Sequence, residues 1–444
     1  MVFGWRRRKT SPHGNKKKKL RELAKMEFAI PDHFLCPISL DLMKDPVTLS
    51  SGITYDRESI EKWLEAGNFT CPVTNQVLGS FDQIPNHSLR KMIQEWCSQN
   101  QTHGVQRIPT PKIPVMAMEV SEILFSVSAS TGRLDSKGCL ESLQKIQKWA
   151  GESERNRKCI VMNGTANVLA SAFDRFAKES FEKNASLCEE ILSALNWMFP
   201  FDKETQWYLG SETSLNCMVW FLRNSTDLSA KQNSILTMEE VLSSGDHKYA
   251  EELAKIDGAK EILVEFIRKQ VSPTITKASL MSIFYMASSS SSSLSEKIKS
   301  EFVEMGLVSL LVENLVDSEM GMAEKALGVM DELCGCEKGR RKAYENALTI
   351  PVLVKKLLRV SEVATGFSVS AIWKLCKFAS REEERALVEA LQVGCFQKLL
   401  LILQVGCGDE TKEKATELLK LLNPYRAGLE CIETVDFKNL KRSF

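Results

Sequence analysis

The residues best able to bind a metal or carry a covalent intermediate are the thirteen cysteines and five histidines of the chain. No Cys-x-x-Cys pair occurs in the sequence, and residues 30–98 contain only Cys36, Cys71, Cys97, His33 and His87. Two tetrahedral zinc ions need eight ligands, usually in closely spaced pairs. We therefore expect no metal site in this segment and no cofactor for the chain.

A cysteine nucleophile is also unexpected. Cys334 and Cys336 are the only closely spaced cysteines, and no histidine lies within dozens of residues of them. A reactive cysteine needs a neighbouring base or cation to lower its thiol pKa, so a structural role between helices is the better interpretation. Because no glycine-rich phosphate loop is present either, the sequence predicts no catalytic residue of its own.

The compact segment 30–104 must position whatever chemistry there is. Its pattern predicts a hairpin of strands 47–49 and 53–55, a helix over 57–66 capped by Asp56, and a later helix capped by Asn86. So small a core needs additional support. Without a metal, we expect a buried polar network, each member of which must be hydrogen-bonded, formed by Ser39, Asp41, Thr48, Tyr55, Asp56, Glu58, Asn68 and Asn86.

From about Ala117 to Asn423 the pattern is helical and repetitive. Gly164, Gly258 and Gly306 are each followed, four and five residues later, by a pair of large aliphatic residues. Similar pairs follow Leu348 at the same offset and Thr213 and Gly394 one residue later, so the anchors are 42 to 49 residues apart. Periods near 40–47 residues are typical of HEAT or armadillo solenoids, in which stacked helical units complete a shared core.

Composition divides the 444 residues into five parts. Residues 1–29 form a basic head that we expect to be disordered, and the compact segment 30–104 follows. Residues 105–130 are a proline-containing linker with a first helix, 131–424 are the helical repeats, and 425–444 are a C-terminal tail. The predicted fold class is mainly α, with a small α+β domain followed by a helical solenoid.

The compact segment contains several short motifs, which are residues 34–40 (FLCPISL), 45–48 (DPVT), 52–57 (GITYDR), 70–74 (TCPVT) and 84–87 (IPNH). Together they strongly resemble the U-box, the zinc-free relative of the RING domain. With the repeats behind them, the chain is similar to plant U-box/armadillo E3 ubiquitin-protein ligases. Residues 81–87 and the linker from Ile108 resemble the defence- and stress-associated subgroup with an N-terminal U-box.

This resemblance implies a partner and an activity. A U-box ligase binds a ubiquitin-charged E2 enzyme and holds its thioester in a reactive pose, without a covalent ubiquitin intermediate on the ligase. That is catalysis by proximity and orientation. The armadillo-type solenoid would hold protein substrates. The residues that match the family's E2-binding positions are Ile38, Leu40, Trp63, Pro72 and Asn75.

Asn75 departs from the family pattern, because many active RING and U-box domains have Arg or Lys there to bridge E2 and ubiquitin. Asn can hydrogen-bond but lacks the charge and fork of Arg. It favours the alternative function, a non-catalytic armadillo scaffold or adaptor with a weak or inactive U-box. Ordinary core packing is the alternative role for Ile38, Leu40 and Trp63, and loop shaping for Pro72.

The formal net charge of +1 conceals +9 in residues 1–25 and −8 in the remainder. Near neutrality argues against a nucleic-acid binder, and no apolar run reaches the roughly 18 residues of a transmembrane segment. The head could be a nuclear signal, a peripheral contact with an anionic membrane, or a solubilising tail. Scattered cysteines indicate reduced thiols. We expect a cytoplasmic or nuclear protein whose partners are the E2 and its substrates, and leave a homodimer open.

Overall fold

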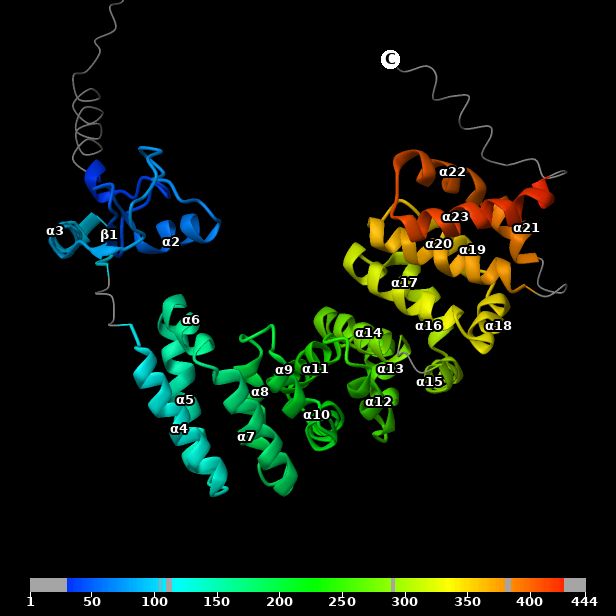
Figure 1. Cartoon of the computed structure of the whole chain (residues 1–444), viewed down its shortest axis with the longest axis horizontal. Coiled ribbons are helices and arrows are strands. Elements are labelled where there is room, and N and C mark those ends of the chain that lie inside the picture. The colour runs from blue at the N-terminus through cyan, green and yellow to red at the C-terminus, as the bar shows by residue number, and fades with distance from the viewer. Residues whose placement is uncertain (1–29, 104, 109–113, 289–291, 380–384, 427–444) are drawn as a thin grey trace, which may run out of the picture. The chain divides into compact units, whose positions relative to one another are not determined.

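The computed structural model describes residues 30–103, 105–108, 114–288, 292–379 and 385–426 (Figure 1). The basic head 1–29, for which we expected disorder, lies outside the described residues, as does the C-terminal tail from residue 427 onward. The chain divides into two units, Met1–Ile113 and Pro114–Phe444. These units correspond to the compact segment and to the helical repeats.

The small unit is built around a three-stranded antiparallel sheet. β1 (Pro46–Thr48) lies between β2 (Thr54–Asp56) and β3 (Ile84–Pro85). Within residues 30–103, the unit also contains two α-helices and two short 3-10 helices, which are α2 (Arg57–Glu65), α3 (His87–Gln99), η1 (Asp32–Phe34) and η2 (Gln101–His103). The expected hairpin and both expected helices are present.

A small apolar core joins these elements. Phe34, Val47, Ile60 and Ile93 are buried in it, one from each of η1, β1, α2 and α3. Ile108, from the segment assigned to the linker, is buried in the same core. The start of that segment therefore packs on the compact unit.

The large unit consists of helices that follow one another in chain order (Figure 1). Two helices come first, α4 (Ala117–Gly132) and α5 (Ser136–Glu152). Six triplets follow within the described ranges. They are α6 (Glu154–Met162), α7 (Thr165–Ser180), α8 (Ala185–Leu195); α9 (Lys203–Leu209), α10 (Glu212–Asn224), α11 (Leu228–Leu242); α12 (His247–Lys255), α13 (Ala259–Lys269), α14 (Pro273–Ala287); α15 (Ser292–Glu304), α16 (Leu307–Asp317), α17 (Met320–Cys334); α18 (Glu337–Glu345), α19 (Thr349–Lys356), α20 (Glu362–Lys377); and α21 (Arg385–Gln392), α22 (Cys395–Val405), α23 (Asp409–Leu422), after which η3 (Asn423–Arg426) ends the described chain.

Left-handed glycines make the corner before the second helix in four triplets. Gly164, Gly258, Gly306 and Gly394 are the N-cap residues of α7, α13, α16 and α22, with φ of 74°, 77°, 81° and 81°. A residue with a side chain pays roughly 1–2 kcal/mol in this conformation, which explains why glycine recurs at the repeat period. Leu348, at the same place before α19, has φ of −86°, so that corner uses ordinary backbone.

Stacking of the triplets produces one continuous core. The third helices α8, α11, α14, α17, α20 and α23 each pack against the next, and buried apolar residues extend from Val120 to Leu422. The unit is therefore a helical solenoid, as expected. α4 packs on α5 and α7 through residues such as Leu124 and Val127, so the first helix, assigned with the linker, belongs to the solenoid.

None of the described helices alone is long and apolar enough to cross a membrane. α21 and α22 reach that length and apolar content only together, and they are bent by 67° relative to each other.

The glycine corners give a stability prediction. Gly164→Ala should lower the free energy of unfolding by about 1–2 kcal/mol, because the left-handed backbone disfavours alanine although no atom lies within 4 Å of the added Cβ. Gly151→Ala is the matched control inside α5, where the Cβ also has free space and alanine should stabilise by up to about 1 kcal/mol. Chemical denaturation followed by circular dichroism measures both, and equal effects would contradict the corner role.

Candidate functional site

Two loops of the small unit share one backbone hydrogen-bond pattern. Loop 1 comprises residues 34–43 and loop 2 residues 69–78. The N–H of Cys36 donates to the carbonyl of Asp41 over 2.8 Å, and the equivalent bond of loop 2, from residue 71 to residue 76, has the same length. The other bonds of the two loops also correspond with an offset of 35 residues, so the loops are structural copies of each other.

Each loop has one residue in the left-handed conformation at the same place. Leu40 has φ of 60° and Asn75 has φ of 56°. Asn adopts this conformation readily, whereas Leu does so at a cost of roughly 1–2 kcal/mol. The Leu40 side chain is nevertheless 73% exposed, so this strain is not offset by burial in the core. Leu40 is therefore available to contact a partner, and the E2-binding role expected for it stays a prediction.

The loop equivalence also identifies a residue that the motif comparison missed. Val73 occupies in loop 2 the place of Ile38 in loop 1, and it is 52% exposed, while Ile38 and Pro72 are partly exposed. The internal repeat of Cys-Pro-Ile-Ser as Cys-Pro-Val-Thr was the sequence signal that could have revealed it. Both loop tips therefore expose aliphatic side chains.

Tyr55 of β2 holds loop 2. Its buried hydroxyl lies 3.0 Å from Cys71 Sγ and accepts a hydrogen bond from the backbone N–H of Val73 over 3.3 Å. Burial, together with the hydrogen bond to Cys71, raises the pKa of Tyr55, so the hydroxyl keeps its proton and can donate it to the sulfur. The tip of loop 2 is thereby fixed to the sheet.

Asp56, the next residue of β2, holds loop 1. Its backbone N–H donates to Cys36 Sγ over 3.3 Å, and its carboxylate Oδ1 accepts the backbone N–H groups of Lys44 and Asp45 over 2.7 and 2.8 Å. We expected this side chain to cap α2, but it makes no capping bond there. The carboxylate instead satisfies the two amides that follow loop 1.

The two loop cysteines act as hydrogen-bond partners. Burial opposes ionisation of both thiols, yet hydrogen bonds from the backbone of Ser39 and Asp56 hold the pKa of Cys36 below its usual range. Hydroxyl groups lower the pKa of Cys71 to about 6 against the same opposing effect, and they belong to Ser51, Thr74 and Tyr55. Within the described residues, no three His, Cys, Asp or Glu side chains are grouped so as to hold a metal ion.

Trp63 connects α2 to loop 2. Its indole Nε1 donates to the carbonyl of Thr70 over 2.9 Å, and Asn68 Nδ2 donates to the carbonyl of Trp63 over 3.1 Å. Trp63 packs on the core but stays partly exposed. Its aromatic ring thus both supports loop 2 and contributes to the surface beside it.

Asp45, just before β1, is the centre of an ion-pair cluster that the sequence analysis did not predict. Asp45 accepts from Arg57 Nε over 2.7 Å and from Arg90 Nη1 over 3.4 Å, and Arg57 also donates to Gln83 over 3.0 Å. Arg57 and Arg90 lie in the first turns of α2 and α3, where the helix dipole disfavours cations. Their unfavourable position was the signal that each has a specific anionic partner.

The remaining members of the expected polar network divide into two groups. Thr48 and Thr54 hydroxyls are 2.9 Å apart, and Asn86, which caps α3 through the N–H of Leu89 at 3.0 Å, also reaches Thr48 at 3.4 Å. Ser39, Asp41 and Glu58, in contrast, are exposed and do not belong to a buried network. Ser39 Oγ accepts the N–H of Asp41 over 3.4 Å, and Glu58 faces solvent on α2, where the hydrogen bond from Lys62 lowers its pKa.

Comparisons with known proteins match both units. A family model of the U-box domain matches residues 30–102, and a model of the plant U-box protein ARM repeat region matches residues 119–442. The chain belongs to this plant U-box/armadillo family. The resemblance inferred from the loop motifs is thereby confirmed.

Relatives of this U-box/armadillo protein cover almost its whole length. U-box domain-containing protein 21 of Arabidopsis thaliana is 48% identical over 423 residues, 94% of each chain. E3 ubiquitin-protein ligase PUB22 of the same plant is 34% identical and aligns with 89% of this chain and 94% of its own. A solved structure of a designed armadillo repeat protein aligns with 56% of this chain and 99% of its own, at 18% identity and a TM-score of 0.47.

The U-box places the five candidate E2-binding residues on two loops and one helix. Ile38 and Leu40 lie on loop 1, Pro72 and Asn75 on loop 2, and Trp63 on α2, from which it bonds to loop 2. The structure therefore connects Trp63 directly to loop 2, and β2 connects loop 2 to loop 1. The E2-binding role of these five residues stays a prediction.

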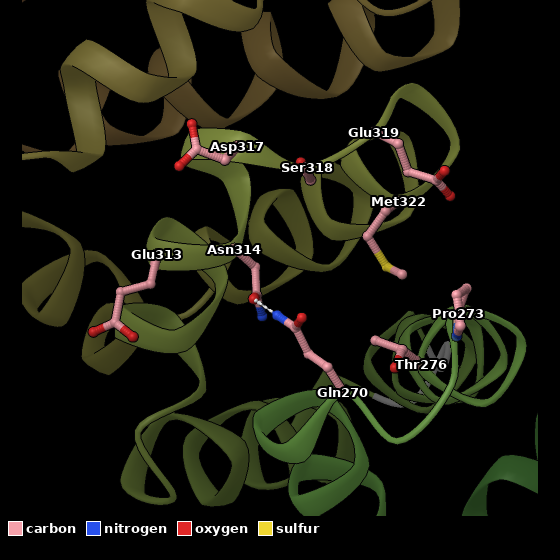
Figure 2. A pocket seen from close by; sticks show the side chains of 9 residues that line it. All are labelled: Gln270, Pro273, Thr276, Glu313, Asn314, Asp317, Ser318, Glu319 and Met322. Carbon is pink, nitrogen blue, oxygen red and sulfur yellow. Dashed lines mark hydrogen bonds between the residues drawn. The ribbon is translucent and has the colours of Figure 1, made fainter.

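The armadillo region contains a cavity of about 320 Å³ where α13 and α14 meet α16 and α17 (Figure 2). Met322 and Thr276 face each other across it, and Gln270 Nε2 donates to Asn314 Oδ1 over 2.6 Å beside them. Its three carboxylates, Glu313, Asp317 and Glu319, point in different directions (Figure 2). Because they do not converge, the cavity offers a recess for a side chain and no arrangement for acid–base chemistry.

Tyr55→Phe tests how loop 2 is held. The free energy of unfolding should fall by about 1–3 kcal/mol, because the N–H of Val73 and the thiol of Cys71 lose their partner. Amide hydrogen exchange at residues 71–76 should accelerate more than exchange in α3. Lys62→Gln, which breaks an exposed ion pair on α2, is the control and should change neither quantity appreciably. Unchanged exchange in loop 2 of the Tyr55 variant would remove Tyr55 from this role.

Proposed function

We propose that this protein is an E3 ubiquitin-protein ligase. Its U-box recruits a ubiquitin-charged E2, and its armadillo repeats hold the substrate whose lysine receives ubiquitin. The observation that carries the proposal is the pair of hydrogen-bonded loops with exposed aliphatic tips, above all Leu40 and Val73. Two relatives that are each 34% identical are named E3 ubiquitin-protein ligases, which supports the same activity.

The reaction needs positioning more than chemistry from this chain. The substrate lysine attacks the thioester carbonyl between ubiquitin and the E2 cysteine, the thiolate of that cysteine leaves, and an isopeptide bond forms. Holding both reactants in an attack geometry can supply about 7–11 kcal/mol of the barrier. Ile38, Leu40 and Val73 would bury aliphatic area against the E2, with roughly 1.5–3 kcal/mol available for each large side chain that becomes fully buried.

The loop cysteines are unsuited to carry ubiquitin themselves. Cys36 and Cys71 are buried, and their sulfurs already accept hydrogen bonds from Asp56 and Tyr55. A transferring cysteine must be accessible as well as ionised. The ionisable Cys71 is therefore better explained as a structural acceptor, which supports transfer directly from E2 to substrate.

The second candidate function is a scaffold with a weak or inactive U-box. Asn75 favours it, because its exposed side chain lacks the charge that many family members place there. Its backbone, however, has the same left-handed geometry as Leu40, so the loop itself is fully formed. We therefore rank the ligase first and attribute to Asn75 a slower transfer or a narrower choice of E2.

The setting of this activity follows only from the resemblance. We propose a role in plant defence or stress signalling, based on residues 81–87 and the linker from Ile108, and a cytoplasmic or nuclear location.

Ile38→Lys should lower the initial rate of autoubiquitination at least about tenfold, the change expected when 1.4 kcal/mol of E2 binding is lost to a buried charge. The assay contains E1, ubiquitin and several E2 enzymes. Met92→Lys places the same charge at an exposed apolar position of α3 and should retain the activity. Undiminished conjugates with Ile38→Lys would contradict the docking role, and no conjugates from the unmodified protein with any E2 would favour the scaffold.

Asn75→Arg should raise the rate of transfer per folded molecule about threefold to tenfold, because a charge-assisted, forked donor replaces a neutral amide. Arg tolerates the left-handed backbone less well than Asn, so a loss of about 1 kcal/mol in stability is expected alongside. Gln76→Arg adds the same charge one residue later and serves as the control. Equal acceleration by both variants would indicate a general charge effect and not a role of position 75.

A further inference from the structure

The second helices of the triplets share one apolar position that is buried in four triplets and open in the last. It is the sixth residue after the corner in α7, α13, α16, α19 and α22. In the first four of these helices the residue is at most 2% exposed, and the four are Ala170, Val264, Val312 and Val354. Leu400 has the same place in α22, yet it is 44% exposed.

Contacts between triplets account for this difference. α7 packs against α10, α13 against α16, α16 against α18 and α19, and α19 against α21, so each of these second helices meets the triplet that follows it. α22 packs against α21 and α23 of its own triplet, and within the described ranges only η3 follows α23. Because solenoids need terminal repeats with a polar outer face, the free side of α22 should be polar.

Two neighbouring positions of α22 are instead apolar. The seventh and eleventh residues after the corner are polar or charged in α7, α13, α16 and α19, where they are Ser171 and Arg175, Glu265 and Lys269, Glu313 and Asp317, and Lys355 and Arg359. In α13 these two side chains form an ion pair at 2.6 Å. α22 has Leu401 and Val405 at the two positions, and they are 46% and 71% exposed. We call Phe396, Leu400, Leu401 and Val405 the α22 face.

The chain leaves the described structure at this face. Arg426 is the last described residue, and its guanidinium carbon lies 4.1 Å from the centroid of the Phe396 ring. Residues 427–444, eighteen in all, follow it in the sequence. Phe396 and Val405 are nine residues apart on one helix, or about 14 Å along its axis, which about five residues of extended chain would cover. The C-terminal tail is therefore long enough to cross the whole face.

The sequence of the tail is suited to an apolar surface. Residues 427–437 contain Leu429, Ile432, Val435 and Phe437 and no lysine or arginine. The match to the plant U-box protein ARM repeat region also extends to residue 442, sixteen residues beyond Arg426. The place where the chain leaves the structure and the extent of the family match thus connect the same tail to the last triplet.

We propose that residues 427–437 pack on the α22 face and cap the solenoid. The aliphatic and aromatic side chains of the tail cover Leu400, Leu401 and Val405, which removes exposed apolar area from water. The tail thereby replaces the triplet that follows each of the other second helices. This contact forms within one chain and needs neither an E2 nor a substrate. A second copy of the chain is the competing occupant of the face.

A photoreactive residue in the full chain tests the proposal directly. p-Benzoylphenylalanine replaces Leu401, which is exposed, so the core stays intact. Irradiation should produce a cross-link within one chain between position 401 and the tryptic peptide 427–438, located by mass spectrometry. The matched control carries the same probe at Glu313, the equivalent position of α16, and should give no cross-link to the tail. Cross-links from position 401 to a second copy, or none to the tail, would overturn the proposal.

Variants of the tail distinguish packing from mere proximity. Leu429→Ser, Ile432→Ser and Val435→Ser together should accelerate amide hydrogen exchange in α22 about tenfold, because local opening no longer breaks an apolar contact. Lys438→Ser combined with Lys441→Ser keeps these apolar residues and should change the exchange by less than about twofold. Exchange in α7, in the first triplet, should be the same in both variants. If α22 exchanges equally fast in the triple variant and in the unmodified protein, the tail does not cap the solenoid.

Discussion

The small domain depends on two consecutive residues of one short strand. Side chains alternate across a strand, so Tyr55 and Asp56 of β2 point to opposite sides and each reaches a different loop. Tyr55 holds Cys71 and Val73, and Asp56 holds Cys36 together with two amides after loop 1. These neutral and charge-assisted hydrogen bonds give the loops their fixed geometry. The strained backbone of Leu40 can persist because the surrounding bonds determine it.

The stability of the solenoid depends instead on the packing of each triplet against the neighbouring triplets. Each triplet turns at its corner and buries its apolar face on the next triplet, so the core is shared and local variation is tolerated. Polar residues on the third helices are then free to differ between triplets. Lys374 and Asp331 form an ion pair between α20 and α17, whereas Asn196 and Asn233 form an amide hydrogen bond between the end of α8 and α11.

Sequence patterns predicted the elements because helices, hairpins and caps depend on local signals. Asn86 capped its helix as expected, and Gly164 and its equivalents lay at corners. Polar pairs between residues far apart in the sequence could not be predicted in this way. Asp45 pairs with two arginines that lie 12 and 45 residues away. Asp56 likewise accepts the backbone N–H groups of Lys44 and Asp45 and makes no capping bond to α2. The prediction that Glu58 belongs to the buried network was wrong, because a polar residue near the start of a helix does not reveal which face of the helix it occupies. The loop geometry was visible only as a short internal repeat.

The equivalence of loops 1 and 2 has a consequence for how recognition can diversify. The same backbone hydrogen bonds form both loops, so the side chains at the loop tips are not needed to fold them. A substitution at the place of Ile38 or of Val73 changes what the surface offers while the frame persists. In the proposed interface, a substitution at one tip can therefore change which E2 fits there, while the other tip keeps its contact.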